Sequence, residues 1–452
     1  MGLGLFGGGV GVSRFLVRAG ARVVVTDLKR EEDLRESVAE LRGLPVELHL
    51  GGHRDEDFAG ADLVIVNPAV PESSPYLRAA KALDTEMNLF FKLCRAERIV
   101  GITGSNGKTT TTALVGEILR RGPARVHVGG NIGVSLIERI EEIAPEDVVV
   151  LELSSFQLEN LGALRRSPNV SAVMNLTPNH LDRHGTMENY VAAKRQIVAH
   201  QRADDWKVLN RDDPLVRDFA KAAPSRNAFF SIREPVERGA QGDGETILLR
   251  MTGSKFAIDV SRRKLPGWFN LQNMSAAAAA SFVAAGAHWE GWRDAAEEVF
   301  RTFPGVEHRL EFVAEKGGVK FYNDSIATNP ESTIAALDVL PGPVVLLAGG
   351  YDKKLPFEGL AERAAGRARV VVTHGQTGPA IAALLRGRGP EVIETKGFEQ
   401  AVRAAAAAAR PGDTVLLSPA CASYDLFRNF AERGRKFKEL VAALPGPASE
   451  PH

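Results

Sequence analysis

Short apolar runs alternate with longer amphipathic stretches along almost the whole chain. Eight of these runs have the length of buried strands: 23–26, 63–66, 99–102, 148–151, 170–174, 344–348, 370–373 and 414–417. Continuous apolar strands are typical of parallel sheets covered on both faces, and helices between them indicate βαβ units. The pattern therefore predicts an α/β fold built on parallel sheets.

Two breaks in this pattern suggest three domains, which is also the number expected for 452 residues. The first break lies near residue 93, and the second at Phe303-Pro304-Gly305. Residues 225–265 contain polar and glycine-rich turns around short strand-like pieces, so we expect a β excursion there. The expected domains are 1–93, 94–302 and 303–452.

Composition narrows the class of protein. Fifty-six basic residues balance fifty-six acidic ones, so no net field favours nucleic acid or an anionic membrane as a partner. The chain has two cysteines and no apolar run long enough for a transmembrane helix, and its first residues do not resemble a signal peptide. We expect a cytoplasmic, soluble protein of several domains.

The strongest local signal is the segment 101–110, Gly-Ile-Thr-Gly-Ser-Asn-Gly-Lys-Thr-Thr, between a strand pattern and a helix pattern that starts near residue 111. Glycines let backbone N–H groups converge on phosphate oxygens, and the helix N-terminus favours negative charge. Lys108 would reach the outer phosphates of a nucleotide, and Thr109 would hold Mg²⁺. The strict phosphate-loop pattern has glycine where this chain has Ile102, so an ordinary glycine-rich turn is the alternative.

A phosphate loop needs a metal partner, and Glu152 is the best candidate. It follows the strand pattern 148–151, and ligands bind at the carboxyl ends of strands in open α/β sheets. Its setting is apolar, and carboxylate oxygens suit Mg²⁺. The alternative is a surface charge at the end of a strand.

Lys194 falls on the apolar face of a helix predicted for 186–200, with Thr186 as its cap. A buried ammonium is costly unless a polar site compensates it, and the alternative is that Lys194 reaches out to water. His180 lies just upstream, in a segment that follows another strand pattern. Four strand ends, at 103–109, 129–133, 152–155 and 175–182, therefore predict one shared site.

These motifs resemble the Mur ligases, the ATP-dependent amino-acid-adding enzymes of peptidoglycan synthesis. The matching segments, in order along the chain, are 101–110, 129–133, 151–158, 175–185 with Tyr190 and Lys194, 269–273, 308–311, 323–330, 349–354 and 418–434. Within the family, the segments 323–330 and 418–434 and the short length resemble the member that adds D-glutamate.

The resemblance implies a Rossmann-like first domain for the UDP of UDP-N-acetylmuramoyl-L-alanine, a central phosphate-loop ATPase, and a Rossmann-like third domain that brings D-glutamate. It implies closure of the third domain, hinged near 303–305, over an acyl phosphate intermediate. The ATP-binding residues it implies are Gly104, Ser105, Asn106, Gly107, Lys108, Thr109, Thr110, Asn270, Asn273, Arg309 and Asp324. The substrate-binding residues it implies are Asp27, Asn131, Ser154, Thr328, Lys353, Ser423 and Phe430.

The resemblance also implies two Mg²⁺ sites, served by Thr109, Glu152 and His180, and a carbamylated Lys194. Carbamylation would turn a cation that repels Mg²⁺ into an anion that binds it. One departure is Ile326, which stands where the D-glutamate-adding member has lysine.

Several alternatives remain. Within the class they are another Mur ligase or a folylpolyglutamate synthase-like ligase. An NAD-dependent oxidoreductase would fit the two Rossmann-like ends but not the Lys108-Thr109 loop, and a non-catalytic nucleotide-binding protein is a further reading.

Overall fold

The computed structural model describes residues 1–4, 8–68, 70, 71, 73–132, 134–251, 253–265, 267–286, 289–340 and 342–444. Gly133, in the predicted strand-end segment 129–133, lies outside these residues. The chain divides into two compact units. The first comprises Met1–Arg263 and Phe269–Thr302, and the second comprises Lys264–Trp268 and Phe303–His452. The three-domain boundaries given above stay a prediction.

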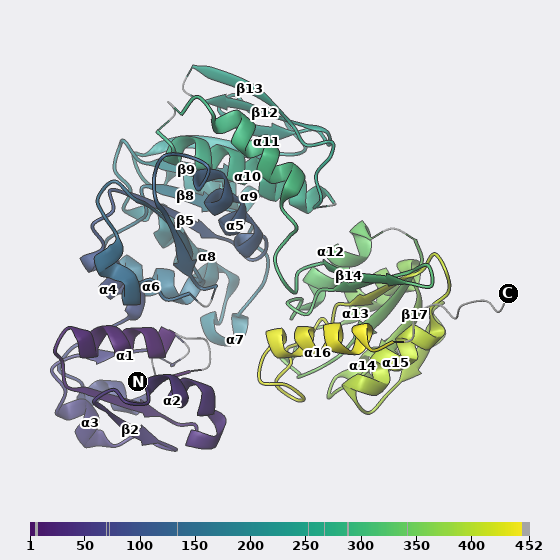
Figure 1. Ribbon diagram of the computed structural model, residues 1–452, viewed down its shortest axis with the longest axis horizontal. Helices are drawn as coiled ribbons and strands as arrows, with labels where there is room; N and C mark the ends of the chain where they lie inside the picture. Colours follow the sequence, from purple (N-terminus) through teal and green to yellow (C-terminus); the bar gives the residue numbers. More distant parts are fainter. Residues whose placement is uncertain are drawn as a thin grey trace. The chain divides into compact units, whose positions relative to one another are not determined.

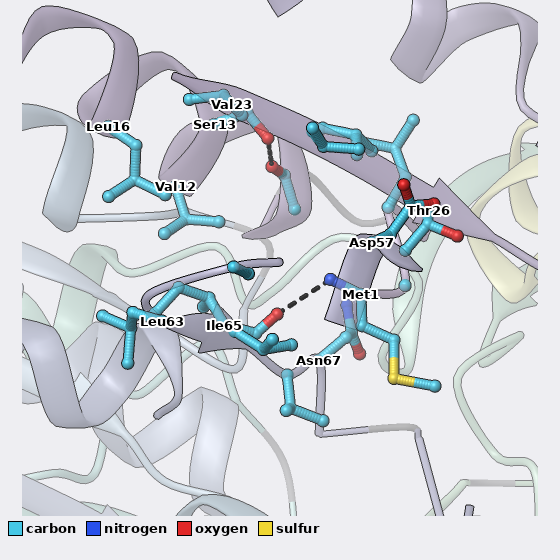
Figure 2. Close-up of a pocket in the computed structure, with 18 of the residues that line it drawn as sticks. Met1, Val12, Ser13, Leu16, Val23, Thr26, Asp57, Leu63, Ile65 and Asn67 are labelled. Carbon is cyan, nitrogen blue, oxygen red and sulfur yellow. Dashed lines mark hydrogen bonds between the residues drawn. The ribbon is translucent and has the colours of Figure 1, made fainter. Parts of the chain in front are cut away.

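The amino-terminal part of the first unit contains two short parallel strand pairs, β1 with β2 and β3 with β4. Its elements are α1 (Gly8–Arg18), β1 (Val23–Asp27), α2 (Arg35–Leu41), β2 (Val46–Leu50), α3 (Asp55–Ala59), β3 (Val64–Ile65), β4 (Leu83–Asp84) and α4 (Glu86–Leu93). A cavity of about 670 Å³ lies between β1 and β3. Figure 2 shows Val12 and Leu16 of α1, Val23 of β1, and Leu63 and Ile65 beside β3 around it.

The rest of the first unit is built on a nine-stranded sheet with the order β13-β12-β11-β10-β9-β8-β5-β7-β6 (Figure 1). Its strands are β5 (Arg98–Thr103), β6 (Val126–Gly130), β7 (Val148–Glu152), β8 (Val170–Val173), β9 (Trp206–Asn210), β10 (Arg226–Ser231), β11 (Gly239–Gly242), β12 (Thr246–Met251) and β13 (Ser254–Asp259). Its helices are α5 (Lys108–Leu119), α6 (Ser155–Ala163), α7 (Leu181–His184), α8 (Met187–Ala199), α9 (Pro214–Arg217), α10 (Trp268–Ala284) and α11 (Trp292–Thr302).

The pairs from β6 to β11 are parallel, which confirms the parallel sheet expected from the apolar runs. The β excursion predicted for 225–265 is a continuation of this sheet, because β10 and β11 add to it in parallel and β12 and β13 add antiparallel. Ile99 and Val149 share one apolar cluster with Leu158 of α6 and Ile197 of α8. The sheet is therefore buried, as its apolar sequence requires.

The second unit holds a six-stranded sheet with the order β14-β15-β19-β16-β17-β18, in which only the β14–β15 pair is antiparallel. Its strands are β14 (Glu311–Lys316), β15 (Val319–Asn323), β16 (Val344–Ala348), β17 (Ala368–Thr373), β18 (Glu391–Glu394) and β19 (Thr414–Leu417). Its helices are α12 (Pro330–Val339), α13 (Glu358–Arg367), α14 (Gly378–Leu385), α15 (Phe398–Ala408) and α16 (Phe430–Ala442). Two apolar clusters pack on this sheet, one with α12, α13 and α14 and the other with α15 and α16.

Across the described ranges, no helix is both long enough and apolar enough to cross a membrane.

Candidate active site

The glycine-rich loop joins β5 to α5, as the sequence predicts. The helix begins at Lys108, three residues before the expected start, because Gly107 caps it with a left-handed φ of 82°. A Cβ at Gly107 would lie 2.4 Å from Oδ1 of Asn273, and one at Gly104 would lie 2.8 Å from Cβ of Met174. Both glycines are thus required by close packing. The same contact places Asn273 of α10 against the loop.

The side chain of Lys108 folds back onto the backbone of this loop. Its Nζ donates to the backbone oxygens of Gly104 and Ser105, each at 2.9 Å. The ammonium therefore sits at the helix N-terminus, among the backbone groups that a phosphate would approach. The neighbouring Thr109 is partly exposed, whereas Thr110 is buried.

The segment after β8 holds the loop in place. Asn106 donates its backbone N–H to Oδ1 of Asn175 at 2.8 Å, and Nδ2 of Asn175 donates back to the Asn106 oxygen at 3.1 Å. The hydroxyl of Ser105 donates to the Thr177 oxygen at 2.8 Å and lies 2.9 Å from the hydroxyl of Tyr190. Two of the four predicted strand ends are therefore joined directly.

Lys194 is buried, with 2% of its surface exposed, so the expectation that it could reach out to water is wrong. Its Nζ donates to Oγ1 of Thr103 at 3.2 Å and lies 4.9 Å from the centre of the Tyr190 ring. Burial lowers the pKa of Lys194 well below 10.5; the charge of Lys108 lowers it further, and Glu152 opposes the shift. The uncharged amine is thus favoured in this site.

Glu152 is also buried, at 2% exposure, which excludes the surface-charge alternative. Its Oε1 accepts a hydrogen bond from Nδ2 of Asn131 at 3.0 Å, and its backbone oxygen accepts from the Asn131 N–H at 2.9 Å. Its Oε2 is buried and has no hydrogen-bond partner among the described residues. A buried carboxylate oxygen without a donor is the kind of group that a cation satisfies.

Aromatic and basic side chains form a cluster next to the segment that follows Glu152. Of the cluster's members, only His180 was predicted from the sequence as a site residue. The His180 ring meets the Phe156 ring edge-on at 5.1 Å, and the His184 ring stacks on Phe156 at 5.1 Å. The guanidinium of Arg183 lies 4.3 Å from the centre of the same ring. His184 also lies 2.9 Å from the hydroxyl of Ser155, and burial lowers its pKa. The spacing of His180 and His184, one helical turn apart, was the signal that could have found this cluster.

Four further predicted residues of the first unit have clear local roles. Ser154 forms a capping box for α6, accepting from the Gln157 N–H at 3.3 Å. Asn270 and Asn273 are buried on α10, and Nδ2 of Asn273 donates to Oδ1 of Asn270 at 3.2 Å. Asp27 ends β1, far along the chain from the phosphate loop, and its two oxygens accept from the backbone N–H groups of Gly4 and Lys29.

The second unit has most of its predicted residues after the carboxyl ends of three neighbouring strands, β15, β19 and β16, whereas Arg309 precedes β14. Asp324 follows β15; its oxygens accept from the Leu310 N–H at 3.1 Å and from Oγ of Ser418 at 2.8 Å. Burial raises the pKa of Asp324 to about 7, although the charge of Arg309 opposes the shift. Nε of Arg309 is buried and has no hydrogen-bond partner in the part of the unit that the structure describes.

Lys353, after β16, lies 3.4 Å from both the backbone oxygen and Oγ1 of Thr328. Ser423, after β19, is buried, and its backbone oxygen accepts from the Phe427 N–H at 2.8 Å. Phe430 begins α16, and its ring meets the His308 ring edge-on at 6.2 Å. Ile326 is half-buried, and its backbone N–H donates to the His308 oxygen at 3.2 Å.

Comparisons with known proteins identify the family of the chain. The family models that match are the MurD-like N-terminal domain of Mur ligases at residues 1–88, the Mur ligase middle domain at 102–281, and the glutamate ligase domain of Mur ligases at 308–421. Together they cover most of the chain.

Similar curated proteins span the full length. The UDP-N-acetylmuramoylalanine–D-glutamate ligase of Symbiobacterium thermophilum is 46% identical over 450 residues, 96% of this chain and 97% of the relative. The enzyme of the same name from Roseiflexus sp. is 45% identical over 98% of both chains. Among solved structures, the UDP-N-acetylmuramate-alanine ligase MurC of Thermotoga maritima shares the fold, with a TM-score of 0.65 and 19% identity over 97% of this chain and 98% of that one. The chain belongs to the Mur ligase family.

Proposed function

We propose that this protein is an ATP-dependent ligase that joins D-glutamate to UDP-N-acetylmuramoyl-L-alanine and releases ADP and phosphate, a step of peptidoglycan precursor synthesis. The observation that carries the proposal is full-length identity of 46% to a ligase of that name. Around the glycine-rich loop, the buried side chains of Glu152 and Lys194 and the half-buried Lys108 support the same conclusion.

ATP would bind with its phosphates at Gly104, Ser105, Asn106, Gly107, Lys108, Thr109 and Thr110. The helix N-terminus and Lys108 would offset the phosphate charge. The resemblance to Mur ligases implies that Asn270 and Asn273 would lie near the adenine, and Asn273 packs against Gly107 of the loop. The resemblance to Mur ligases implies that Arg309 and Asp324 also contact ATP.

The donor set of the first unit fits Mg²⁺, because Glu152 offers a buried carboxylate oxygen without a partner. The residues that would hold it, in two sites, are Thr109, Glu152, His180 and a carbamylated Lys194. When bound, Mg²⁺ neutralises the charge of the phosphate groups.

Carbamylation of Lys194 is supported by its burial and by its position between Thr103 and Tyr190. The uncharged amine forms a C–N bond to CO₂ and loses one proton, so the product is an anionic carbamate. In this form Lys194 would attract the cation that the ammonium repels.

The reaction needs an activated acyl group, because a carboxylate is a poor acyl donor: it is anionic and has no good leaving group. A carboxylate oxygen of the UDP-sugar substrate attacks the γ-phosphorus of ATP, and the bond to ADP breaks. The uncharged amine of D-glutamate then attacks the acyl carbon, phosphate leaves, and the nitrogen gives up a proton. Asn131, Ser154 and Asp27 would position the UDP-sugar substrate.

D-glutamate carries two carboxylates, which need cationic or N–H partners. Lys353 and Thr328, which lie 3.4 Å apart, would supply one set. The segment from Ser423 to Phe430 would supply the other. We further propose that the enzyme acts as a monomer in the cytoplasm, with no nucleic-acid or membrane partner, because its substrates are ATP and small metabolites.

The test is to incubate the protein with ATP, Mg²⁺, UDP-N-acetylmuramoyl-L-alanine and a panel of L- and D-amino acids, and to measure phosphate release and product mass. We expect phosphate release that depends on D-glutamate and a product heavier by one glutamyl residue. Because Ile326 replaces an expected lysine, the panel includes the amino acids used by other Mur ligases. Product with another amino acid alone, or none at all, would refute the proposal.

A further inference from the structure

The guanidinium of Arg433 lies inside the second unit, beneath the loops that carry the proposed amino-acid-binding residues. Arg433 belongs to the first turn of α16 and is 1% exposed. Its Nε donates to Oγ of Ser325 at 3.0 Å, and Nη2 donates to the Ser325 oxygen at 2.8 Å. Nη2 also donates to the Cys421 oxygen at 3.0 Å, and Nη1 to the Ala422 oxygen at 3.2 Å. Four of its five N–H groups are thus bound to two loops.

These two loops hold the residues that the proposed function needs. Ser325 lies between Asp324 and Thr328 in the segment after β15, and Cys421 and Ala422 directly precede Ser423 after β19. A single side chain therefore fixes the spacing of two loops that are about 100 residues apart in the sequence.

A third loop joins the same network. The Ala422 oxygen also accepts from the Tyr351 N–H at 2.9 Å, in the segment after β16 that carries Lys353. Gly350 is packed against this point, because a Cβ there would lie 2.3 Å from the Ala422 oxygen and 3.2 Å from Nη1 of Arg433. Oγ of Ser325 donates to the Phe430 oxygen at 2.8 Å, which ties the network back to the start of α16.

The chemistry of this contact is unusual for a buried arginine. Its hydrogen-bond acceptors in the described structure are three backbone oxygens and one hydroxyl, and none is a carboxylate. Burial lowers the pKa of Arg433 to about 10, so the group stays charged at neutral pH. An apolar side chain would fill the same space without the desolvation cost of a cation. A planar fork of donors, by contrast, is suited to fixing several acceptors at once.

We propose that Arg433 is a positioning residue for the amino-acid half of the reaction. It holds the 324–328 and 421–423 segments together so that Thr328 and Ser423 meet the incoming dicarboxylate. Its buried positive charge also adds to the attraction for that dianion. The inference rests on the proposed function and adds a residue that does not itself touch the substrate.

The test compares Arg433→Met and Arg433→Lys with wild type in the full-length protein. Arg367→Met is the matched control, because Arg367 also donates to two backbone oxygens, those of Leu337 and Leu340, at the amino end of β17. The measurements are KM for D-glutamate, KM for ATP, and acyl phosphate trapped as its hydroxamate by hydroxylamine without amino acid.

We expect Arg433→Met to raise KM for D-glutamate about tenfold, the usual effect of losing hydrogen bonds to a charged group. KM for ATP and hydroxamate yield should stay close to wild type, Arg433→Lys should fall between the two, and Arg367→Met should match wild type. Equal KM values for D-glutamate in Arg433→Met and Arg367→Met would overturn the inference. It would also be overturned if Arg433→Met raised KM for ATP as much as KM for D-glutamate.

If Arg433→Met does not fold, Ser325→Ala is the test variant. It removes the hydroxyl that accepts from Nε of Arg433 and keeps the charge of the guanidinium. A raised KM for D-glutamate with an unchanged KM for ATP supports the inference, and unchanged values for both overturn it. If wild type shows no D-glutamate-dependent phosphate release, the proposed function fails, and this inference fails with it.

Discussion

Asp324→Asn tests the electrostatics of the second unit. Burial raises the pKa of Asp324 from 3.8 to about 7, so the folded chain keeps this proton up to about neutral pH. The unfolded chain releases it near pH 3.8. The proton on Asp324 therefore contributes fully to the free energy of unfolding below about pH 4. This contribution is lost as the pH rises to about 7, at ~1.4 kcal/mol per pH unit. The total loss is ~4 kcal/mol, and the asparagine variant should not show it.

Asparagine fits the hydrogen bonds of this site. Its Oδ1 can still accept from the Leu310 N–H, which lies 3.1 Å from Oδ1 of Asp324. Its Nδ2 can donate to Oγ of Ser418, whose own hydrogen can turn to Oγ1 of Thr333 at 3.0 Å. The substitution therefore removes the titrating proton without leaving a buried group unpaired.

The assay is hydrogen exchange of the full-length protein, read by mass spectrometry on peptides from β15 and β19 between pH 5 and pH 8. After correction for intrinsic exchange rates, the opening free energy of these strands should fall with pH in wild type and change much less in Asp324→Asn. Peptides from β5 and β7, in the other unit, are the internal control. Parallel pH curves for the two proteins would refute the reasoning, because they would mean that Arg309 keeps Asp324 ionised in the folded chain.

Three further predictions concern single side chains. Gly107→Ala should raise KM for ATP about tenfold, because it strains a left-handed residue and places a methyl group 2.4 Å from Oδ1 of Asn273; an unchanged KM would contradict this. Glu152→Gln keeps the bond to Asn131 but removes the charge, so Mg²⁺ half-saturation of activity and calorimetric Mg²⁺ binding should weaken about tenfold, and equal binding would exclude Glu152 as a ligand. Burial lowers the pKa of His374 from 6.5 to about 3, and neither ring nitrogen has a hydrogen-bond partner among the described residues. The fold loses stability as pH falls below 6.5, so the unfolding free energy of His374→Leu relative to wild type, measured in urea, should rise by ~2 kcal/mol between pH 8 and pH 5, and a difference that does not change with pH would contradict the reasoning.

The local pattern of the sequence was enough for the fold class and for the phosphate loop. Apolar runs such as 148–151 and 344–348 are buried strands in the structure, because such runs require cover on both faces of a parallel sheet. The loop at 104–107 was visible because its glycines and the following helix are adjacent in the chain. The start of α5 was placed three residues late, since a left-handed glycine cap leaves no apolar signal.

The states of the chemical groups in the site depended on tertiary structure. The sequence left Lys194 either buried or extended to water, and left Glu152 either a ligand or a surface charge. Which alternative holds depends on strands that are distant in the chain and neighbours in the sheet: Lys194 donates to Thr103 at the end of β5, and Glu152 ends β7, which pairs with β5. The roles of the site residues stay predictions.

The sequence also did not single out four side chains whose surroundings come from distant parts of the chain: Phe156, Arg183, His184 and Arg433. Sequence periodicity indicates which side of a helix faces the core, but a buried polar group is defined by its acceptors, and those come from other loops. Arg433 finds its acceptors about 10 and about 100 residues away. The sequence alone therefore determined the fold class, the buried apolar strands and the order of the motifs, whereas only the folded chain decided which polar atoms are buried, which are paired, and which remain available to a ligand.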